Sequence, residues 1–150
     1  MAKKNFDSVD ELRRALFNDL CNAVLKEVVK EMKDIEKEMI EERVYAVFSP
    51  KEYKRRYSNG GLIAEENMRE EIRIGGNDIT VEITNITTGN ESQCKDYYRG
   101  YIQPIVEEGY YIWNGEMPPP RPFIDETQSV IDTTDRIDKI IERVLESMGW

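Results

Sequence analysis

Residues 8–44 read SVDELRRALFNDLCNAVLKEVVKEMKDIEKEMIEERV, and this stretch decides the fold. It contains no proline or glycine, and its apolar residues recur every three or four positions, which is typical of an amphipathic helix. Ser8 with Glu11 forms a capping box, the usual signal for a helix start. We therefore predict one long helix over residues 8–44, roughly 50 Å in length at ~1.5 Å per residue.

The second half of this helix carries a heptad-like seam, in which apolar residues alternate steps of three and four: Leu25, Val28, Met32, Ile35 and Met39. Lysines and acidic residues form two further stripes, which we interpret as a solvated face with local ion pairs. A globule of this chain length is about 30 Å wide. The helix must therefore project, break or pack along a neighbouring subunit.

Outward from the helix, two segments with alternating apolar residues predict a β-hairpin. They run from Met68 to Ile74 and from Asp78 to Ile83, and Gly75-Gly76-Asn77 between them suits the turn. Other expected elements in the mixed, β-rich region 45–115 are a strand over 44–48, a helical turn over 50–57, a polar loop over 87–95, a short helix over 101–108 ended by Gly109, and a strand over 110–113.

A proline-rich segment over residues 118–122 precedes the last predicted element, an amphipathic helix over residues 125–148. Gly149 is a natural C-cap for it. The chain length of 150 residues predicts a single domain over residues 1–150.

The composition narrows the function classes. The chain has 30 acidic and 21 basic side chains, a net charge of −9, which argues against a general nucleic-acid-binding module. Histidine is absent, which removes the commonest general base and most zinc sites. Cys21 and Cys94 form no CxxC pair, and we expect two reduced thiols. We therefore expect no enzymatic activity, no cofactor and no metal.

We expect neither a secretory signal nor a membrane-spanning segment. The N-terminal residues MAKKNFDS do not resemble a signal peptide, and no stretch approaches the ~18 apolar residues of a membrane span. Acidic pairs at Glu65-Glu66, Glu70-Glu71 and Glu107-Glu108 could hold Mg²⁺ or support acid–base chemistry, but we interpret them as surface charge.

Two clusters suit a binding surface. Lys51, Lys54, Arg55 and Arg56 alternate with Tyr53 and Tyr57, a pattern that fits single-stranded nucleic acid or, in an acidic chain, a carboxylate-rich protein surface, which we favour. Tyrosines, Trp113 and Phe123 crowd into residues 97–123, which suits either a core or a protein interface.

These elements together resemble a known family. The order is a long N-terminal helix, the Tyr53-x-Arg55-Arg56-Tyr57 turn running into Gly60-Gly61-Leu62, a β-hairpin, and Arg121-Pro122-Phe123-Ile124 leading into an amphipathic helix. The chain resembles the tail-component, or head–tail joining (tail completion, neck), proteins of long-tailed bacteriophages, in which an R-P-F step after the sheet is typical.

The resemblance implies an α+β fold, in which a small curved antiparallel sheet carries the C-terminal helix packed on it. It implies a hexameric ring at the neck and no enzymatic activity. It also implies that Phe123 anchors the last helix to the sheet and that Arg121 lies at the sheet's rim. Tyr53, Arg55, Arg56, Tyr57 and Trp113 are then candidates for subunit contacts.

The expected function is that of a virion structural protein, made in the host cytoplasm and placed in the neck or tail. Its partners would be copies of itself, the connector and the tail-tube proteins, with no membrane. DNA would pass through the ring without sequence-specific binding, since an acidic bore repels phosphates. Three alternatives stay open: a tail-terminator ring, a coiled-coil adaptor or regulatory module that dimerises through the seam, and a small enzyme or nucleic-acid-binding protein acting through residues 51–56.

Overall fold

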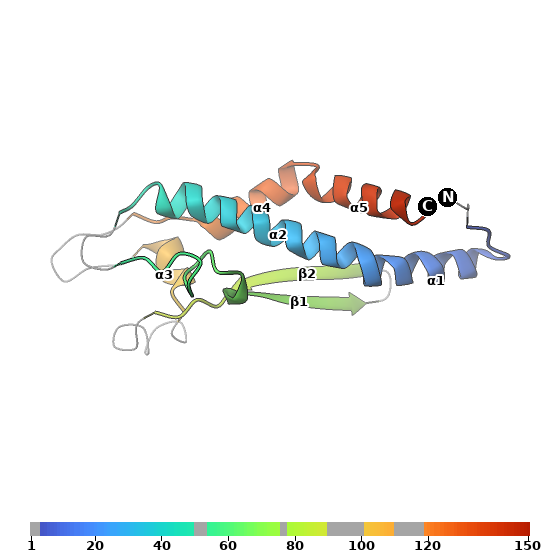
Figure 1. Ribbon diagram of the computed structural model, residues 1–150, viewed down its shortest axis with the longest axis horizontal. Coiled ribbons are helices and arrows are strands. Elements are labelled where there is room, and N and C mark those ends of the chain that lie inside the picture. The colour runs from blue at the N-terminus through green and yellow to red at the C-terminus, as the bar shows by residue number, and fades with distance from the viewer. Residues whose placement is uncertain (1–3, 50–53, 76–77, 90–100, 110–118) are drawn as a thin grey trace.

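A computed structural model describes residues 4–49, 54–75, 78–89, 101–109 and 119–150. The long helix predicted at the N-terminus is confirmed. It consists of α1 (Val9–Asp19), the π-helical turn η1 (Leu20–Val24), α2 (Leu25–Met39) and a second π-helical turn, η2 (Ile40–Tyr45). The backbone stays right-handed helical at every junction, so these four segments form one continuous rod along the length of the molecule (Figure 1).

The start of this rod has the predicted cap. The Ser8 Oγ accepts a hydrogen bond from the Glu11 N–H at 3.1 Å, and the Glu11 carboxylate in return accepts one from the Asp7 N–H at 3.0 Å. The second bond lies one residue earlier than in the standard capping box, where the N-cap N–H is the donor. Two of the N–H groups at the helix entry are thereby satisfied.

The end of the rod differs from the prediction, because the strand expected over residues 44–48 is wrong. The helix continues through Tyr45, after which the Ala46 N–H donates to the Glu41 carbonyl at 2.9 Å and the Phe48 N–H to the Val44 carbonyl at 3.3 Å. Local helix-type bonds thus use the backbone groups that a strand would need. The β-branched and aromatic composition of this segment misled the sequence-based interpretation.

The predicted hairpin is confirmed. β1 (Met68–Gly75) pairs antiparallel with β2 (Asp78–Asn85), in a register that places Met68 opposite Asn85 and Gly75 opposite Asp78. A 3₁₀ turn, η3 (Glu65–Asn67), leads into β1. Turn residues 76 and 77, the predicted strand 110–113 and most of the predicted loop 87–95 lie outside the described residues, as does the first half of the predicted turn 50–57. Residues 54–56 are not helical.

The C-terminal segment forms two helices where one was predicted: α4 (Phe123–Thr133) and α5 (Arg136–Ser147). At the break, the Thr133 Oγ1 donates to the Ser129 carbonyl and the Thr134 Oγ1 to the Val130 carbonyl, and Thr134 is extended. Threonine hydroxyls that bond back to the preceding turn compete with the helical ladder and end it here. Gly149, with φ +86°, terminates α5 as predicted.

The C-terminal helices and the hairpin form layers on the two sides of the rod. α4 and α5 run along α2 on one side of the rod, and the hairpin lies on its other side (Figure 1). The α+β class is confirmed, and α4 meets the sheet at the base of the hairpin, where Phe123 shares a core cluster with Met68, while both C-terminal helices run along α2. α2 can lie between the two layers because it buries apolar residues toward both neighbours: Leu25, Val28, Val29, Ile35 and Met39.

The main core lies at the η2 end of the rod. Its buried members come from five parts of the chain: Met39, Ile40, Val44, Leu62, Met68, Val106 and Phe123. Val106 lies on α3 (Gln103–Glu108), which confirms the predicted short helix and ends at Gly109 with φ +77°. Within the part of the chain that the structure covers, no helix is long and apolar enough to cross a bilayer.

The opposite end of the rod packs more lightly. α1 contains no buried residue. Residues near the two ends of the chain cover part of this end of the rod. The Phe6 ring stacks on the Trp150 ring with centroids 5.3 Å apart, and the Trp150 indole N–H donates to the Asp19 carboxylate at 2.8 Å. This bond and the Lys4 ammonium lower the pKa of Asp19, the Lys4 contact being the larger cause.

Candidate subunit interface

Arg55, predicted to contact a neighbouring subunit, caps the long helix of its own chain. Its guanidinium donates to the Tyr45 carbonyl at 3.0 Å and to the Val44 carbonyl at 3.3 Å, and it lies 4.8 Å from the centre of the Tyr45 ring. A cation at a helix C-terminus pairs with the last carbonyls and with the negative end of the helix dipole. The structure therefore gives Arg55 a role within the protomer.

Two neighbours of Arg55 hold the same loop in place. The Tyr57 ring meets the Tyr45 ring edge-on at 4.9 Å, and the Arg56 guanidinium donates to the Thr88 carbonyl. Tyr57 has φ +49°, and a Cβ at Gly61 would lie 2.4 Å from the Tyr57 carbonyl oxygen, so glycine is required at that close approach. Tyr57 still exposes 48% of its surface and stays a candidate for contact with another chain.

Phe123 and Arg121 are both buried. Phe123 is completely enclosed by the core, where it packs with Met68 at the base of the hairpin and joins the start of α4 to it. Arg121, which the resemblance placed at the rim of the sheet, is 3% exposed. Its guanidinium stacks 5.0 Å from the centre of the Phe48 ring, and its backbone N–H donates to the Val106 carbonyl. Tyr53 and Trp113 lie outside the described residues.

A buried polar network that the sequence interpretation missed attaches the hairpin to the rod. The Asn85 amide donates to the Glu36 carboxylate and to the Leu62 carbonyl, both at 2.9 Å, and the Thr87 hydroxyl donates to the Asn85 carbonyl oxygen at 2.6 Å. All three side chains are at most 1% exposed. Burial raises the pKa of Glu36, while the Asn85 bond opposes the rise.

Glu107 makes a second unforeseen link, between α3 and α4. Its carboxylate accepts a hydrogen bond from the Ile124 N–H at 2.6 Å, which caps the first turn of α4 from a distant part of the chain. Burial raises the pKa of Glu107 to about 7, and the bond from Ile124 partly offsets that rise. No local pattern announces this cap, because Pro122 at the N-cap position supplies no side-chain acceptor.

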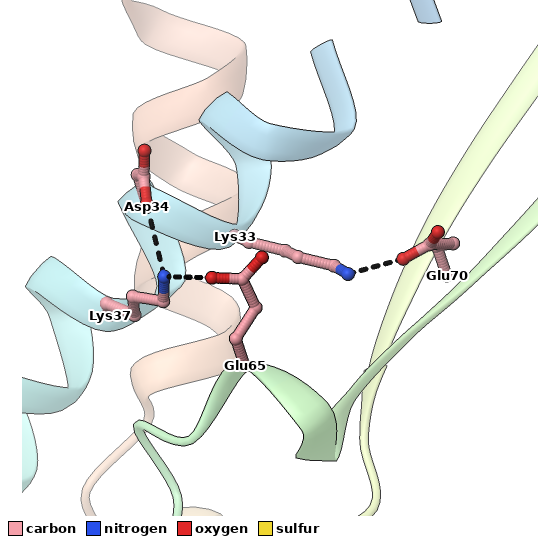
Figure 2. A network of polar contacts seen from close by, with 5 residues as sticks. All are labelled: Lys33, Asp34, Lys37, Glu65 and Glu70. Atoms are coloured by element: carbon pink, nitrogen blue, oxygen red, sulfur yellow. Dashed lines mark hydrogen bonds and ion pairs between the residues drawn. The ribbon is translucent and has the colours of Figure 1, made fainter. Parts of the chain in front are cut away.

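Charged residues connect the rod to the hairpin. Lys33 of α2 pairs with Glu70 of β1, and Lys37 bridges Glu65 at 3.0 Å and Asp34 at 3.3 Å (Figure 2). The predicted local pairing is thus confirmed only for Lys37 with Asp34. The other two pairs are tertiary, and they use acidic residues that were candidates for a metal or acid–base site.

On the opposite side of the rod, Arg136 attaches α5 to α2. Its guanidinium binds the Glu38 carboxylate through two bonds of 2.6 and 2.9 Å and the Glu31 carboxylate through one of 2.6 Å. This bidentate geometry is the strongest form of a carboxylate–cation contact. The hydrogen bond and charge of Arg136 lower the pKa of Glu38, the bond being the larger cause.

The heptad-like seam is covered by the chain itself. Leu25, Val28, Ile35 and Met39 are all buried within the protomer. The coiled-coil dimer that the seam suggested would need these side chains at the surface. Among the described residues, no group of three or more His, Cys, Asp and Glu side chains could hold a metal ion.

One flank of the hairpin stays uncovered. The apolar residues of β2 (Ile79, Val81 and Ile83) are half-buried toward α2, whereas Ile72 and Ile74 of β1 are 40% and 55% exposed. Over the described residues the sheet has two strands, so the outer edge of β1 has no strand beside it. This strand and α1, which contains no buried residue, are therefore candidates for contact with another chain.

Comparison with known proteins gives one match. No curated protein and no solved structure matches the chain significantly. The sequence profile of the family described as YomN matches residues 8–147, from the capping residue of the rod to the end of α5. The chain therefore belongs to the YomN family, which is phage-derived.

Proposed function

We propose that this chain is a structural protein of the phage particle, which forms a ring at the neck and joins the tail tube to the head–tail connector. Its membership of the phage-derived YomN family supports a phage role. The resemblance noted in the sequence, from the Tyr53–Tyr57 turn to the Arg121–Ile124 step, supports the neck as its place. The proposal assigns the chain no catalytic step.

The observation that carries the proposal is the uneven burial of the rod and the hairpin. α1 buries no residue, and β1 exposes Ile72 and Ile74 along an unpaired edge within the described residues. A two-stranded hairpin is marginally stable by itself, and an open, partly apolar edge favours pairing with another chain. Such a surface is expected in a protein that works as one subunit of an assembly.

The charge of the chain fits the same role. Copies with a net charge of −9 would line a ring that repels DNA phosphates, so that DNA passes without binding. The expected partners are other copies of the chain in a hexameric ring, the connector on one side and the tail tube on the other. The protein would then reside in the virion after synthesis in the host cytoplasm.

Deletion of the gene from the phage or prophage that encodes it tests this proposal. Electron microscopy of the lysate should show filled heads and finished tails lying apart, and the wild-type gene supplied on a plasmid should restore complete particles. Tails of uncontrolled length would identify a tail terminator instead. Intact, infectious particles from the deletion strain would contradict any structural role at the neck.

A further inference from the structure

We propose that the outer edge of β1 is a subunit contact, and that its occupant is the β2 edge of a second copy of this chain, which extends the antiparallel sheet from copy to copy. The proposal rests on the assembly role proposed above and names the surface that would perform it. The partner is the chain itself, since β2 offers the strand and α2 the apolar cover that β1 lacks.

The position of the helix above the hairpin argues for this arrangement. Within one protomer α2 packs on β2, and β1 lies on the side of β2 away from α2 (Figure 1), with Ile72 and Ile74 exposed. When β2 of a second copy joins β1, the α2 of that copy lies over the same face of the extended sheet. Ile72 and Ile74 are then flanked by a helix on each side. A twofold contact between two β1 strands would leave these isoleucines between two distant helices with no cover.

The charges on the opposite face of the hairpin are complementary in the same sense. The exposed residues of β1 on that face are two arginines and one glutamate: Arg69, Glu71 and Arg73. Those of β2 are two acidic residues and two threonines: Asp78, Thr80, Glu82 and Thr84. A join of β1 to β2 sets a net positive row beside a net negative one, and opposite charges across strands stabilise the pairing.

The backbone supports a contact that repeats. In each protomer β1 and β2 run antiparallel, so a β1 edge against a β2 edge of the next copy continues the alternation of strand directions. This contact joins two different surfaces, and a head-to-tail contact of that kind generates a ring when its rotation closes. Strand addition of this type uses main-chain hydrogen bonds and is a recurring mode of protein recognition.

A two-cysteine mixing experiment tests the contact on the full chain. Cys21 and Cys94 are replaced by serine, and single cysteines are introduced as Glu71→Cys on β1 or Thr84→Cys on β2, both at exposed positions. Mild oxidation should join the two variants by a disulfide only when they are mixed, because a disulfide spans Cα atoms less than ~7 Å apart, whereas equivalent positions in neighbouring copies lie two strands, about 10 Å, apart. Glu142→Cys on α5, also exposed, is the matched control and should cross-link with neither.

A second pair of variants separates the contact from folding. Ile74→Asp places a charge in the proposed contact, and Val47→Asp places one at an exposed site on the far end of the rod, where Val47 is 57% exposed. Ile74→Asp should reduce the cross-linked fraction at least about tenfold, because burial of an unpaired charge costs more than the ~1.4 kcal/mol of one decade. Val47→Asp should leave it unchanged, and both should unfold at the wild-type temperature.

Each outcome decides the matter. Cross-linking within the Glu71→Cys protein alone would replace the proposal by a twofold contact. No cross-link in the mixture, at the highest concentration at which the protein is soluble, would overturn it. Because this experiment uses purified protein and the deletion experiment uses particles, the contact can fail while the neck function holds, and the reverse.

Discussion

The two ends of the long helix are built in opposite ways. At the η2 end, Phe123, Ile40 and Ile35 are completely buried, and a polar network and several ion pairs fix the neighbouring elements. At the α1 end no residue of α1 is buried, and the described contacts there include the stacking of Phe6 on Trp150, the cation–π contact of Lys4 with the same ring and the bonds to Asp19. One continuous helix thus serves as the core of the fold at one end and as an open surface at the other.

The hairpin repeats this contrast over eight residue pairs. At its base Met68 and Asn85 are 2% and 1% exposed, while toward the turn Ile72 and Ile74 are largely open. The base therefore stabilises the protomer, and the distal part of β1 has little to contribute to it. Apolar residues that alternate along the same strand thus have different roles, depending on whether another element covers them.

The largest expected effect separates the two ends of the helix. Phe123→Ala should lower the free energy of unfolding by about 3–5 kcal/mol, because it leaves a cavity in a closed core. Ile74→Ala, at the open end of the hairpin, should change it by less than about 0.5 kcal/mol. Denaturant titration of the two variants measures both values, and equal losses would break the contrast.

Asn85→Ala should have the next largest effect. It removes both donors from the Glu36 carboxylate and the Leu62 carbonyl in a buried site, and we expect a loss of about 2–3 kcal/mol. The loss should increase with pH, because burial raises the pKa of Glu36 and the carboxylate that forms at higher pH is left without its donor. Asn67→Ala, which removes a half-buried amide bonded to the Gly61 carbonyl, is the matched control and should cost less.

The Glu107 cap should make the free energy of unfolding depend on pH. Its pKa is raised by burial to about 7, so the folded state holds this proton more tightly than the unfolded state, and stability falls as pH rises from about 4.5 to 7. Glu107→Gln stays neutral throughout. The free energy of unfolding of the variant, relative to the wild type, should increase by about 1–2 kcal/mol across that interval, after allowance for solvent screening of a half-exposed group.

Exposed Glu66→Gln, measured in parallel, controls for the loss of one surface carboxyl. A parallel profile for Glu107→Gln would show that this carboxyl has an ordinary pKa. The measurement is a denaturant titration at intervals of pH between 4.5 and 8.

Arg136→Ala should have the smallest of these effects, about 1 kcal/mol, because the contact of Arg136 with Glu31 and Glu38 is multiple but partly exposed. Arg136→Lys should recover only part of the loss, since a lysine cannot bind Glu38 through two parallel bonds. Thermal unfolding at low and high salt measures the effect, which screening should reduce. A loss that is independent of salt would indicate that packing, not charge, is responsible.

Elements with a strong local signal were predictable from the sequence. Ser8 with Glu11 marked the helix start, alternating residues around Gly75 marked the hairpin, and Gly109 and Gly149 marked two helix ends. In each of them the bonds that define the element join residues close in the sequence. The same reasoning failed at residues 44–48, where the helix continues because Arg55 caps it from ten residues away.

The contacts that polar residues make with distant parts of the chain could not be predicted from the sequence. Arginines such as Arg121 and Arg55 are common at protein interfaces. Only their contacts with the Phe48 and Tyr45 rings show that they bind within their own chain. Glu36 did offer a signal, since it lies four residues before Ile40 within an apolar stripe of α2. An acidic residue at such a position predicts a buried partner, but Asn85, 49 positions away, could not be named.

Hydrogen exchange along β1 tests the central claim most directly, that the open surface of this protein is completed by further copies of the chain. Exchange is read by mass spectrometry in dilute protein and in concentrated protein, with the core helix α2 as internal reference. The account predicts that the β1 amides that are not bonded to β2 exchange rapidly when dilute and become protected when concentrated, while α2 and the β1 amides bonded to β2 are protected in both. Equal exchange of β1 under the two conditions would contradict it.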